Sequence, residues 1–450
     1  MNATASAADG VSIRRVATAS LIGTSIEFYD FYIFATAAAL IFNKIFFPSY
    51  DSATGTLAAF GALAAAFFAR PIGGIIFGHF GDRVGRKAML VTSLMIMGTA
   101  TVAIGLLPTY DQIGPWAPTL LVIARLLQGI GVGGEFGGAV LMATEHAPQR
   151  LKAFYGSWPL CGVSVGMVLS SGVFFLVQLM PEDQLLTWGW RIPFLASAIL
   201  VAVGLYIRVT LPETPQFEEV KQDKQRFRFP VIEVIKTGWR QILIGVGALA
   251  VTNVFYYIAA VFVLSYRAGE GVSRGFMLIA VCIAATVEGI GILVAALLAD
   301  KFGYRKIIAA GCAFAIVFAF PFFWMINTRN PVLIIVALSL ACGIGVSMTY
   351  APIGAFLSDL FAPNVRYSGL SVSYQASGAF ISGMVPIISL MLLEWSGSSW
   401  SLSLYIAITA TISLLVVLYS SRSAAGATDA DNSSARPSER DAMPNAVVGN

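Results

Sequence analysis

The strongest constraint on this chain is a series of apolar runs, each long enough to cross a lipid bilayer. Three of them cover residues 57–77, 194–207 with its flanks, and 242–264. A helix of about 20 residues matches the thickness of the hydrocarbon core. Of the 450 residues, 57% are hydrophobic and 12% are charged, against roughly 25% charged in a typical soluble domain. The sequence therefore predicts an all-α polytopic membrane protein.

Polar residues, glycines and prolines divide these runs into twelve predicted transmembrane helices. They cover residues 16–46, 53–80, 88–107, 116–145, 152–180, 188–210, 239–265, 274–299, 306–327, 332–360, 367–394 and 398–420. The first run is too long for a cleaved signal peptide and many more runs follow it. We therefore interpret it as a retained helix.

The charged segment "PETPQFEEVKQDKQRFRFP" lies between the sixth and seventh predicted helices and defines the predicted domains. These are a cytoplasmic N-terminal segment (1–15), an N-terminal six-helix bundle (16–211), a cytoplasmic linker (212–238), a C-terminal six-helix bundle (239–420) and a cytoplasmic tail (421–450). The composition of the tail predicts disorder.

Lysine and arginine residues concentrate in alternate loops, which predicts the orientation in the membrane. If the N-terminus is inside, the inner loops hold Arg14, Arg15, Arg83, Arg86, Lys87, Arg150, Lys152, Lys301, Arg305, Lys306 and Arg366. The outer loops hold only Lys44, Arg191, Arg267, Arg274 and Arg329. Both termini are therefore expected in the cytoplasm. These loops also explain the net charge of +4 without a nucleic-acid partner.

The cysteines give no sign of a metal site or a disulfide framework. Cys161, Cys282, Cys312 and Cys342 all lie in apolar runs, and no two of them are close in sequence. We expect them to be core residues, and we expect neither a metal nor a cofactor.

An internal sequence repeat indicates that the chain is built from two related halves. The loop "GHFGDRVGRK" after the second predicted helix returns as "ALLADKFGYRK" after the eighth. Asp82 then corresponds to Asp300 and Gly85 to Gly303, a displacement of 218 residues. Two parallel six-helix bundles around a central site are the transporter arrangement that such a repeat predicts.

The first of these loops resembles the G-x-x-x-D-R-x-G-R-K motif of the major facilitator superfamily, through Gly78, Asp82, Arg83, Gly85, Arg86 and Lys87. The stretches "EFYDFYIF", "ARPIGGIIFGHFGDRVGRK", "RLLQGIGVGGEFGGA", "WGWRIPF", "PETPQF" and "VRYSGLSVSYQ" are similar to the metabolite:proton symporter family. The resemblance runs to about Tyr419. It implies the major facilitator fold and a carrier of the cytoplasmic (inner) membrane. Members of that family carry shikimate, dicarboxylates, oxoglutarate, and proline or betaine.

Two positions depart from the family pattern. Phe136 stands where the family commonly has tryptophan, and Leu160 stands where the fifth helix often has glutamine. The second change removes an amide from a helix that lines the cavity, so it alters what the cavity can hydrogen-bond.

Charged side chains inside the apolar runs carry most of the functional information. They are Glu27 and Asp30 in the first helix, Arg70 in the second, and Arg125 and Glu135 in the fourth. Each Asp, Lys or Arg at a helix centre costs about 2.5–3.5 kcal/mol on insertion scales, so such residues pair or face a wet cavity. Arg125, Gln128, Val132 and Glu135 fall within an arc of roughly 80° on one helix face. We expect this stripe to meet Glu27 and Asp30 at a central cavity.

These residues have two possible roles, and the sequence leaves both open. As functional groups, Asp30 and Glu135, with Glu27 third, would carry protons, because arginine stays charged at accessible pH. Arg125 would then hold a carboxylate or bind an anionic substrate. In the superfamily this R-x-x-Q-G arginine is associated with proton-coupled members. The alternative is that these residues form structural ion pairs, which applies also to Arg70 beside Pro71.

The remaining candidates for the pocket are polar and aromatic side chains of both halves. The predicted substrate-binding residues are Arg125, Gln128, Arg70, Tyr29, Asn253, Tyr257, Tyr350, Tyr374 and Gln375. Each aromatic residue among them is also compatible with a plain core role. Glu288 lies 218 residues after Arg70, so it occupies the corresponding position with opposite charge. It either tunes substrate choice or pairs locally.

Charged residues at the predicted inner helix ends indicate a gate. They are Asp82, Arg83, Arg86, Glu145, Glu213, Asp300, Arg305, Asp359 and Arg366, with Asp300 expected near Arg305 and Asp359 near Arg366. In related carriers such pairs close the inner side. Individual pairs of this kind are weak enough to break in each cycle.

We therefore expect a proton-coupled symporter that imports a small organic acid or zwitterion by alternating access, as a monomer. A uniporter or a proton-driven exporter of the same fold is the alternative. An ATP-driven pump is disfavoured because the sequence has no G-x-x-x-x-G-K-[ST] loop. An intramembrane enzyme would need clustered catalytic groups, which the sequence does not show, and a transporter-like sensor would normally carry an added soluble domain.

Overall fold

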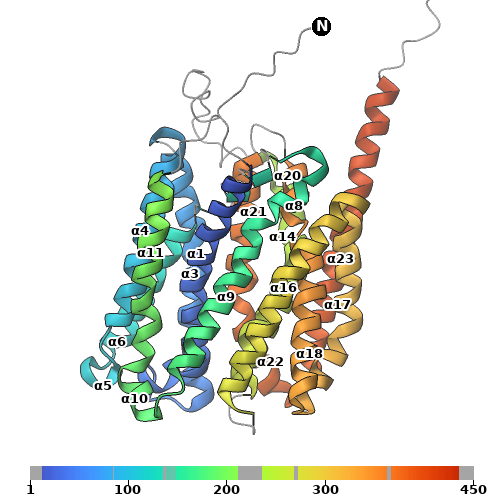
Figure 1. The fold of residues 1–450 in the computed structure, drawn as a ribbon. Coiled ribbons are helices and arrows are strands. Elements are labelled where there is room, and N and C mark those ends of the chain that lie inside the picture. The colour runs from blue at the N-terminus through green and yellow to red at the C-terminus, as the bar shows by residue number, and fades with distance from the viewer. Residues whose placement is uncertain are drawn as a thin grey trace, which may run out of the picture.

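The computed structural model describes residues 13–84, 86–133, 135, 139–140, 143–144, 147–210, 236–267, 272–361 and 366–434. Over these residues the chain forms long helices that stand side by side in two groups (Figure 1). The first half of the chain, blue to green, forms one group, and the second half, yellow to red, forms the other.

The N-terminal bundle contains six long helical segments. They are α1 (Ile13–Leu40), α3 (Ser52–Val84), α4 (Arg86–Leu106), α6 (Trp116–Val132), α8 with α9 (Lys152–Gly156 and Trp158–Val177), and α11 (Ile192–Thr210). Residues 135, 139–140 and 143–144 are also helical and follow α6. Short elements lie between the long segments: α2 (Phe42–Ile45), α5 (Tyr110–Ile113), η1 (Gln149–Leu151), α10 (Glu182–Thr187) and η2 (Gly189–Arg191).

The C-terminal bundle also contains six long segments, several of them interrupted. They are α14–η3–α15 (Trp239–Tyr257, Ile258–Phe262, Val263–Arg267), α16 (Arg274–Phe302), α17 (Tyr304–Asn327), α18–η4–α19–α20 (Pro331–Leu340, Ala341–Val346, Ser347–Tyr350, Ile353–Leu360), α21–η5–α22 (Arg366–Phe380, Ser382–Met384, Val385–Ser396) and α23 (Trp400–Ser434). The η3 and η4 segments are π-helical. Such bulges frequently mark functional sites in helices.

Length and apolar character account for the membrane-crossing role of these segments. Among the described residues, nine helices are long and apolar enough to cross a bilayer, and Val91–Leu106 and Trp116–Val132 are shorter apolar helices. The twelfth segment is α1, which carries Glu27 and Asp30. The predicted start and end of most helices lie within a few residues of the observed ones.

The end of the last helix differs most from the prediction. The sequence assigns residues 421–450 to a disordered tail, but α23 continues to Ser434. Adding residues to a helix that has already formed is far easier than starting a new one, which explains the extension. Residues 435–450, the N-terminal residues 1–12 and most of the predicted linker (211–235) lie outside the described residues.

The two bundles meet along two helix pairs that occupy equivalent positions in the two halves. Helix α9 packs against α16, and α3 packs against α21. Figure 1 shows α9 and α16 side by side at the centre of the molecule. Aromatic rings of α1 and α14 also meet between the bundles, with centroid distances of 6.2 Å for Phe31–Tyr257 and 6.0 Å for Tyr32–Tyr256.

Within the N-terminal bundle, glycines bring α3 and α6 into backbone contact. A Cβ atom on Gly129 would lie 2.1 Å from the carbonyl oxygen of Ala66, and one on Gly73 would lie 2.0 Å from that of Ile130. Small residues at a helix interface permit such an approach in membranes. Gly73 and Gly129 thus permit this close packing, and the contact fixes α3 and α6 beside one another.

We predict that Gly129→Ala destabilises the protein, because the new methyl group meets backbone atoms that cannot rotate away. Overpacking of this kind costs about 1–3 kcal/mol. The matched control is Gly61→Ala on α3, where a Cβ would meet no atom within 4 Å. Alanine should be neutral or stabilising there, since it favours helix by about 1 kcal/mol over glycine. The measurement is the apparent Tm of both purified variants in detergent, and equal Tm values would contradict the prediction.

Candidate functional site

A continuous chain of hydrogen bonds joins Arg125 to Asp30 inside the N-terminal bundle. The Arg125 guanidinium donates to the Gln128 side-chain oxygen, and Gln128 Nε2 donates to Thr101 Oγ1 at 2.8 Å. Thr101 Oγ1 lies 3.0 Å from both Asp30 Oδ2 and the Met97 carbonyl oxygen, so its single proton serves one of these acceptors at a time. The side chains come from α6, α4 and α1. Two neutral groups therefore separate the positive charge from the carboxyl group.

This chain is buried in the bundle. Asp30 and Arg125 have 0% exposure, and Gln128 has 3%. Asp30 Oδ1 has no hydrogen-bond partner within the described part of the chain. Thr101 contacts one carboxyl oxygen of Asp30, and the Ser197 hydroxyl also interacts with this carboxyl group, whose other oxygen can hold a proton.

A second buried arginine lies near the same aromatic ring. The guanidinium carbon of Arg125 is 5.5 Å from the centroid of Phe31, and that of Arg70 is 5.1 Å from the same centroid. Arg125 also lies 4.0 Å from the Phe34 centroid, and Arg70 lies 4.4 Å from the Phe67 centroid. A desolvated cation–π contact contributes about 2 kcal/mol, less than a full counter-ion would. Two guanidinium groups in this arrangement favour the binding of an anionic group.

The predicted polar face of α6 is buried over its whole length. Arg125, Gln128, Val132 and Glu135 are each at most 5% exposed. On α1, Glu27 is 5% exposed and interacts electrostatically with Asp30. The two acids of α1 and the stripe of α6 thus lie in the interior of the protein, away from lipid.

Three predicted residues of the C-terminal bundle reach the N-terminal bundle or its arginines. The ring of Tyr257 packs against Phe67 with a centroid distance of 5.7 Å and interacts electrostatically with Arg70. Gln375 Nε2 donates to the Gly133 carbonyl oxygen at 2.8 Å, across the bundle interface. The hydroxyl of Tyr374 also interacts electrostatically with Arg70.

The remaining pocket candidates bond within their own bundles. The Tyr29 hydroxyl donates to the Pro193 carbonyl oxygen at 2.9 Å. Asn253 Nδ2 donates to Ser377 Oγ at 2.8 Å. Tyr350 and Tyr374 pair through their hydroxyl groups at 3.1 Å. The hydrogen-bond partners of Tyr29 and Asn253 are thus Pro193 and Ser377.

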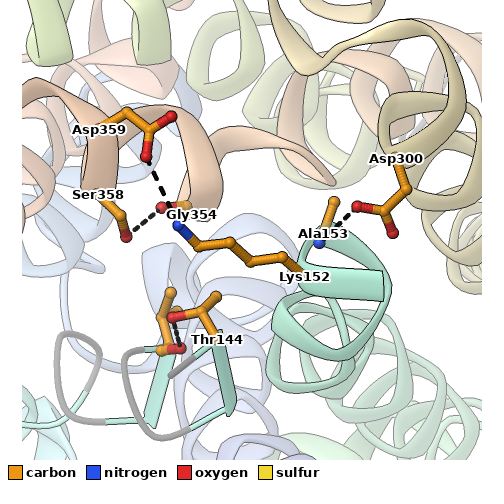
Figure 2. A network of polar contacts seen from close by, with 8 residues as sticks. Thr144, Lys152, Ala153, Asp300, Gly354, Ser358 and Asp359 are labelled. Carbon is orange, nitrogen blue, oxygen red and sulfur yellow. Dashed lines mark hydrogen bonds and ion pairs between the residues drawn. The ribbon is translucent and has the colours of Figure 1, made fainter. Parts of the chain in front are cut away.

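At one end of the molecule, polar contacts hold the two bundles together (Figure 2). The carboxylate of Asp300, near the end of α16, accepts the backbone N–H groups of Ala153 and Phe154 at 2.9 Å each. Lys152 Nζ lies 3.5 Å from Asp359 Oδ1. Both contacts join α8 to the C-terminal bundle, and we refer to this end, where the bundles touch, as the closed end.

The closing contacts differ in detail from the predicted pairs. Asp300 was expected near Arg305, but it binds backbone amides instead, because the start of α8 presents unpaired N–H groups to it. Lys152, which sequence analysis counted only as a loop charge, supplies the partner of Asp359. The other predicted gate residues, Asp82, Arg83, Arg86, Glu145, Glu213 and Arg366, have side chains outside the described residues.

Thr101 was missed by sequence analysis, although it links Gln128 to Asp30. A threonine in an apolar helix carries little positional signal, because it usually bonds back to its own helix. Thr101 is also within reach of its own helix, at Met97, so only the tertiary structure reveals its second role.

Comparison with known proteins decides the family. The family model described as "Major Facilitator Superfamily" matches residues 20–383. The chain belongs to the major facilitator superfamily. Its fold resembles that of the xylose transporter XylE from E. coli in a partially occluded inward-open conformation, with a TM-score of 0.70 and 19% identity over 91% of this chain and 97% of that one.

Curated relatives of this facilitator are metabolite transporters. It is 42% identical over 417 residues to the "Inner membrane metabolite transport protein YhjE" of Escherichia coli (strain K12), covering 90% of this chain and 94% of that protein. It is 37% identical to the shikimate transporter of the same strain, with coverage of 90% and 94%, and 33% identical to its proline/betaine transporter, with coverage of 90% and 83%. The predicted family and the twelve-helix, two-bundle fold are confirmed. The protein is a membrane transporter of small molecules and not an enzyme.

We predict that Thr101→Val destabilises the facilitator, because Asp30 Oδ2 and Gln128 Nε2 both lose their hydrogen bond to the Thr101 hydroxyl. A buried polar group left without a partner costs about 1–3 kcal/mol. Thr92→Val on the same helix is the control, since Thr92 is exposed and bonds only to the Ala88 carbonyl oxygen. The apparent Tm should fall by several degrees for Thr101→Val and stay near wild type for Thr92→Val. A similar Tm for the two variants would contradict the proposed contribution of the Thr101 hydrogen bonds to stability.

We also predict that Asp300→Ala opens the closed end. Hydrogen bonds to charged groups contribute about 1.5–3 kcal/mol, so losing this contact should shift the closed population about tenfold or more. Spin labels at exposed Arg150 and Lys301 in a cysteine-free protein would report the opening as longer distances. Asp359→Ala, which breaks a surface pair of about 0–1 kcal/mol, should shift the distances far less. An unchanged distribution for Asp300→Ala would refute the role of this carboxylate.

Proposed function

We propose that this facilitator imports a small organic acid or zwitterionic metabolite together with protons, by alternating access, and that Asp30 is the central proton carrier. The observation that carries this proposal is the buried chain from Arg125 through Gln128 and Thr101 to Asp30. A purely structural ion pair would place the carboxylate directly on the guanidinium, where its charge is best compensated. Here two neutral groups intervene.

The proposed coupling follows from the charges of this site. With Asp30 ionised, the site holds a negative charge that partly compensates the two arginines. When a proton occupies Asp30, that compensation is lost and the arginines favour an anionic substrate group. A carboxylate binds a guanidinium in a bidentate geometry, and Arg70 and Arg125 share the ring of Phe31. Glu135 and Glu27 are the next candidates for proton binding.

The relatives support a carboxylate-bearing substrate. Their names include shikimate, proline and betaine, and each of these molecules carries a carboxylate at neutral pH. This shared carboxylate is a group that arginine side chains bind well. A membrane potential of 100 mV would add about 2.3 kcal/mol for each net positive charge carried inward.

The weak contacts at the closed end fit a cycle in which this end opens. The Lys152–Asp359 pair is partly exposed, with 27% and 37% exposure of the two side chains, so it contributes about 0–1 kcal/mol. The distribution of Lys and Arg favours a cytoplasmic location for this end and for both termini, in the inner membrane.

The test is uptake by proteoliposomes under an imposed pH gradient, with a panel of shikimate, oxoglutarate, citrate, proline and betaine. We expect accumulation of at least one compound, lost on addition of a protonophore. Accumulation that the protonophore leaves unchanged would indicate a uniporter, and substrate release driven by proton entry would indicate an exporter.

For the site residues we expect Asp30→Asn to lose gradient-driven accumulation but to keep exchange of substrate across the membrane, because the neutral amide cannot carry a proton. Asp51→Asn is the control, since Asp51 is an exposed acid before α3 that caps Ala53 and Thr54, as asparagine also would. Arg125→Lys should weaken uptake of carboxylates by about tenfold or more. Full accumulation by both Asp30→Asn and Glu135→Gln would refute the proton assignment.

A further inference from the structure

Glu288 is a buried acid that the site described above does not use. It lies on α16 with 0% exposure, and among the described residues neither of its carboxyl oxygens has a hydrogen-bond partner within 3.5 Å, the Ser164 hydroxyl being the one side-chain donor that interacts with it. Asp30 differs, because it bonds to Thr101. An acid that is buried with a single long hydrogen-bonding interaction is costly in an apolar medium, so its presence calls for a functional explanation.

The carboxyl group lies at the interface between the two bundles. Its hydroxyl-bearing neighbour on α9 is Ser164, which interacts with the carboxyl group and makes no other hydrogen bond within the described part of the chain. Next to Glu288, a Cβ on Gly289 would lie 3.5 Å from Ser164 Cβ, so the two helices approach closely here. The contact between α9 and α16 therefore contributes to covering the group.

The surroundings of Glu288 contain no positive charge. The titratable groups that interact electrostatically with it come from five other elements: Tyr32 of α1, Cys161 of α9, Tyr256 of α14, Cys342 of η4 and Tyr350 of α19. Tyrosine and cysteine are neutral at physiological pH. No Lys, Arg or His side chain of the described residues acts on it. A carboxylate in this position would be uncompensated, which costs several kcal/mol, so the neutral acid fits the closed interface.

The contacts that hold α9 to α16 near Glu288 are weak. The Cys161 thiol donates to the Gly289 carbonyl oxygen at 3.7 Å, and the Cys282 thiol donates to the Val168 carbonyl oxygen at 3.5 Å. Thiols are weak donors. Polar contacts therefore add little resistance to separation of the two helices beside Glu288, and on separation water would reach the carboxyl group.

We propose that Glu288 is a second proton-binding site of this transporter, and that α9 and α16 close on one another only when it is protonated. In the open state, hydronium transfers a proton to the Glu288 carboxylate, which leaves water and a neutral carboxyl group. After the bundles reopen, the carboxyl group returns the proton to water. The inference rests on the proposed proton-coupled, alternating-access function and adds a proton-binding group in the C-terminal bundle.

The native Cys161 provides the test, because its thiol lies in the interface beside Glu288. Full-length protein in nanodiscs, with the other cysteines replaced by serine, would be labelled with a water-soluble maleimide from mildly acidic to mildly alkaline pH. Glu288→Gln, which mimics the neutral acid, supplies the reference for the thiol's own pH dependence. We expect the ratio of the wild-type rate to the Glu288→Gln rate to rise on the order of tenfold toward alkaline pH, as the ionised acid holds the interface open.

Two further variants keep the test decisive. Glu288→Asp retains a titratable group and should retain the pH dependence even if Glu288→Gln folds poorly. Thr286→Val on the same helix should behave as wild type, because Thr286 is exposed and bonds only to the Cys282 carbonyl oxygen. A pH-independent ratio, or a Glu288→Asp variant with the flat profile expected for Glu288→Gln, would overturn the proposal.

This readout requires neither a substrate nor a gradient, so it can fail separately from the proposed function. Suppose that gradient-driven uptake is lost in Asp30→Asn while the labelling ratio does not change with pH. This result would support the proposed function and refute the proposed role of Glu288 as a proton-binding site. A pH-dependent ratio combined with protonophore-insensitive uptake would retain Glu288 as a proton site and refute proton-coupled import.

Discussion

The arrangement of this transporter depends on how ionisable side chains are accommodated in an apolar interior. Arg125 and Arg70 are buried, and each places its guanidinium over aromatic rings. Asp30 is connected to Arg125 through neutral groups, so each charge is only partly compensated. Partial compensation in a low-dielectric interior keeps the energy of the site sensitive to a single proton or a single anionic group. A fully paired site would lack that sensitivity.

The packing of the two bundles separates rigid parts from parts that can move. Inside the N-terminal bundle, glycines bring the backbones of α3 and α6 into contact, which fixes Arg70 and Arg125 relative to one another. Between the bundles, the polar contacts of the described residues are thiol donors, one partly exposed ion pair, a carboxylate on backbone amides and the Gln375 amide on a backbone carbonyl oxygen. The site residues can thus stay in place while the bundles separate.

The two halves of the chain share an architecture but differ in chemistry at equivalent positions. Arg70 in the first half corresponds to Glu288 in the second, 218 residues later. The arginine interacts with aromatic rings and a second guanidinium, whereas the acid lies among neutral tyrosines and cysteines. Duplication therefore supplied two similar helix positions, and divergence gave them opposite charges.

The sequence by itself determined the helices, their number, the duplicated halves and the burial of the charged stripe on α6. Helix length, apolar character and angular spacing are local properties of the chain, so they can be read without knowing the neighbours. Only the tertiary structure decided that Thr101 bridges to Asp30, that Asp300 binds the amides of α8, and that Tyr29 bonds to Pro193. These partners come from different helices, and the rotation and register of one helix against another depend on packing across the whole bundle.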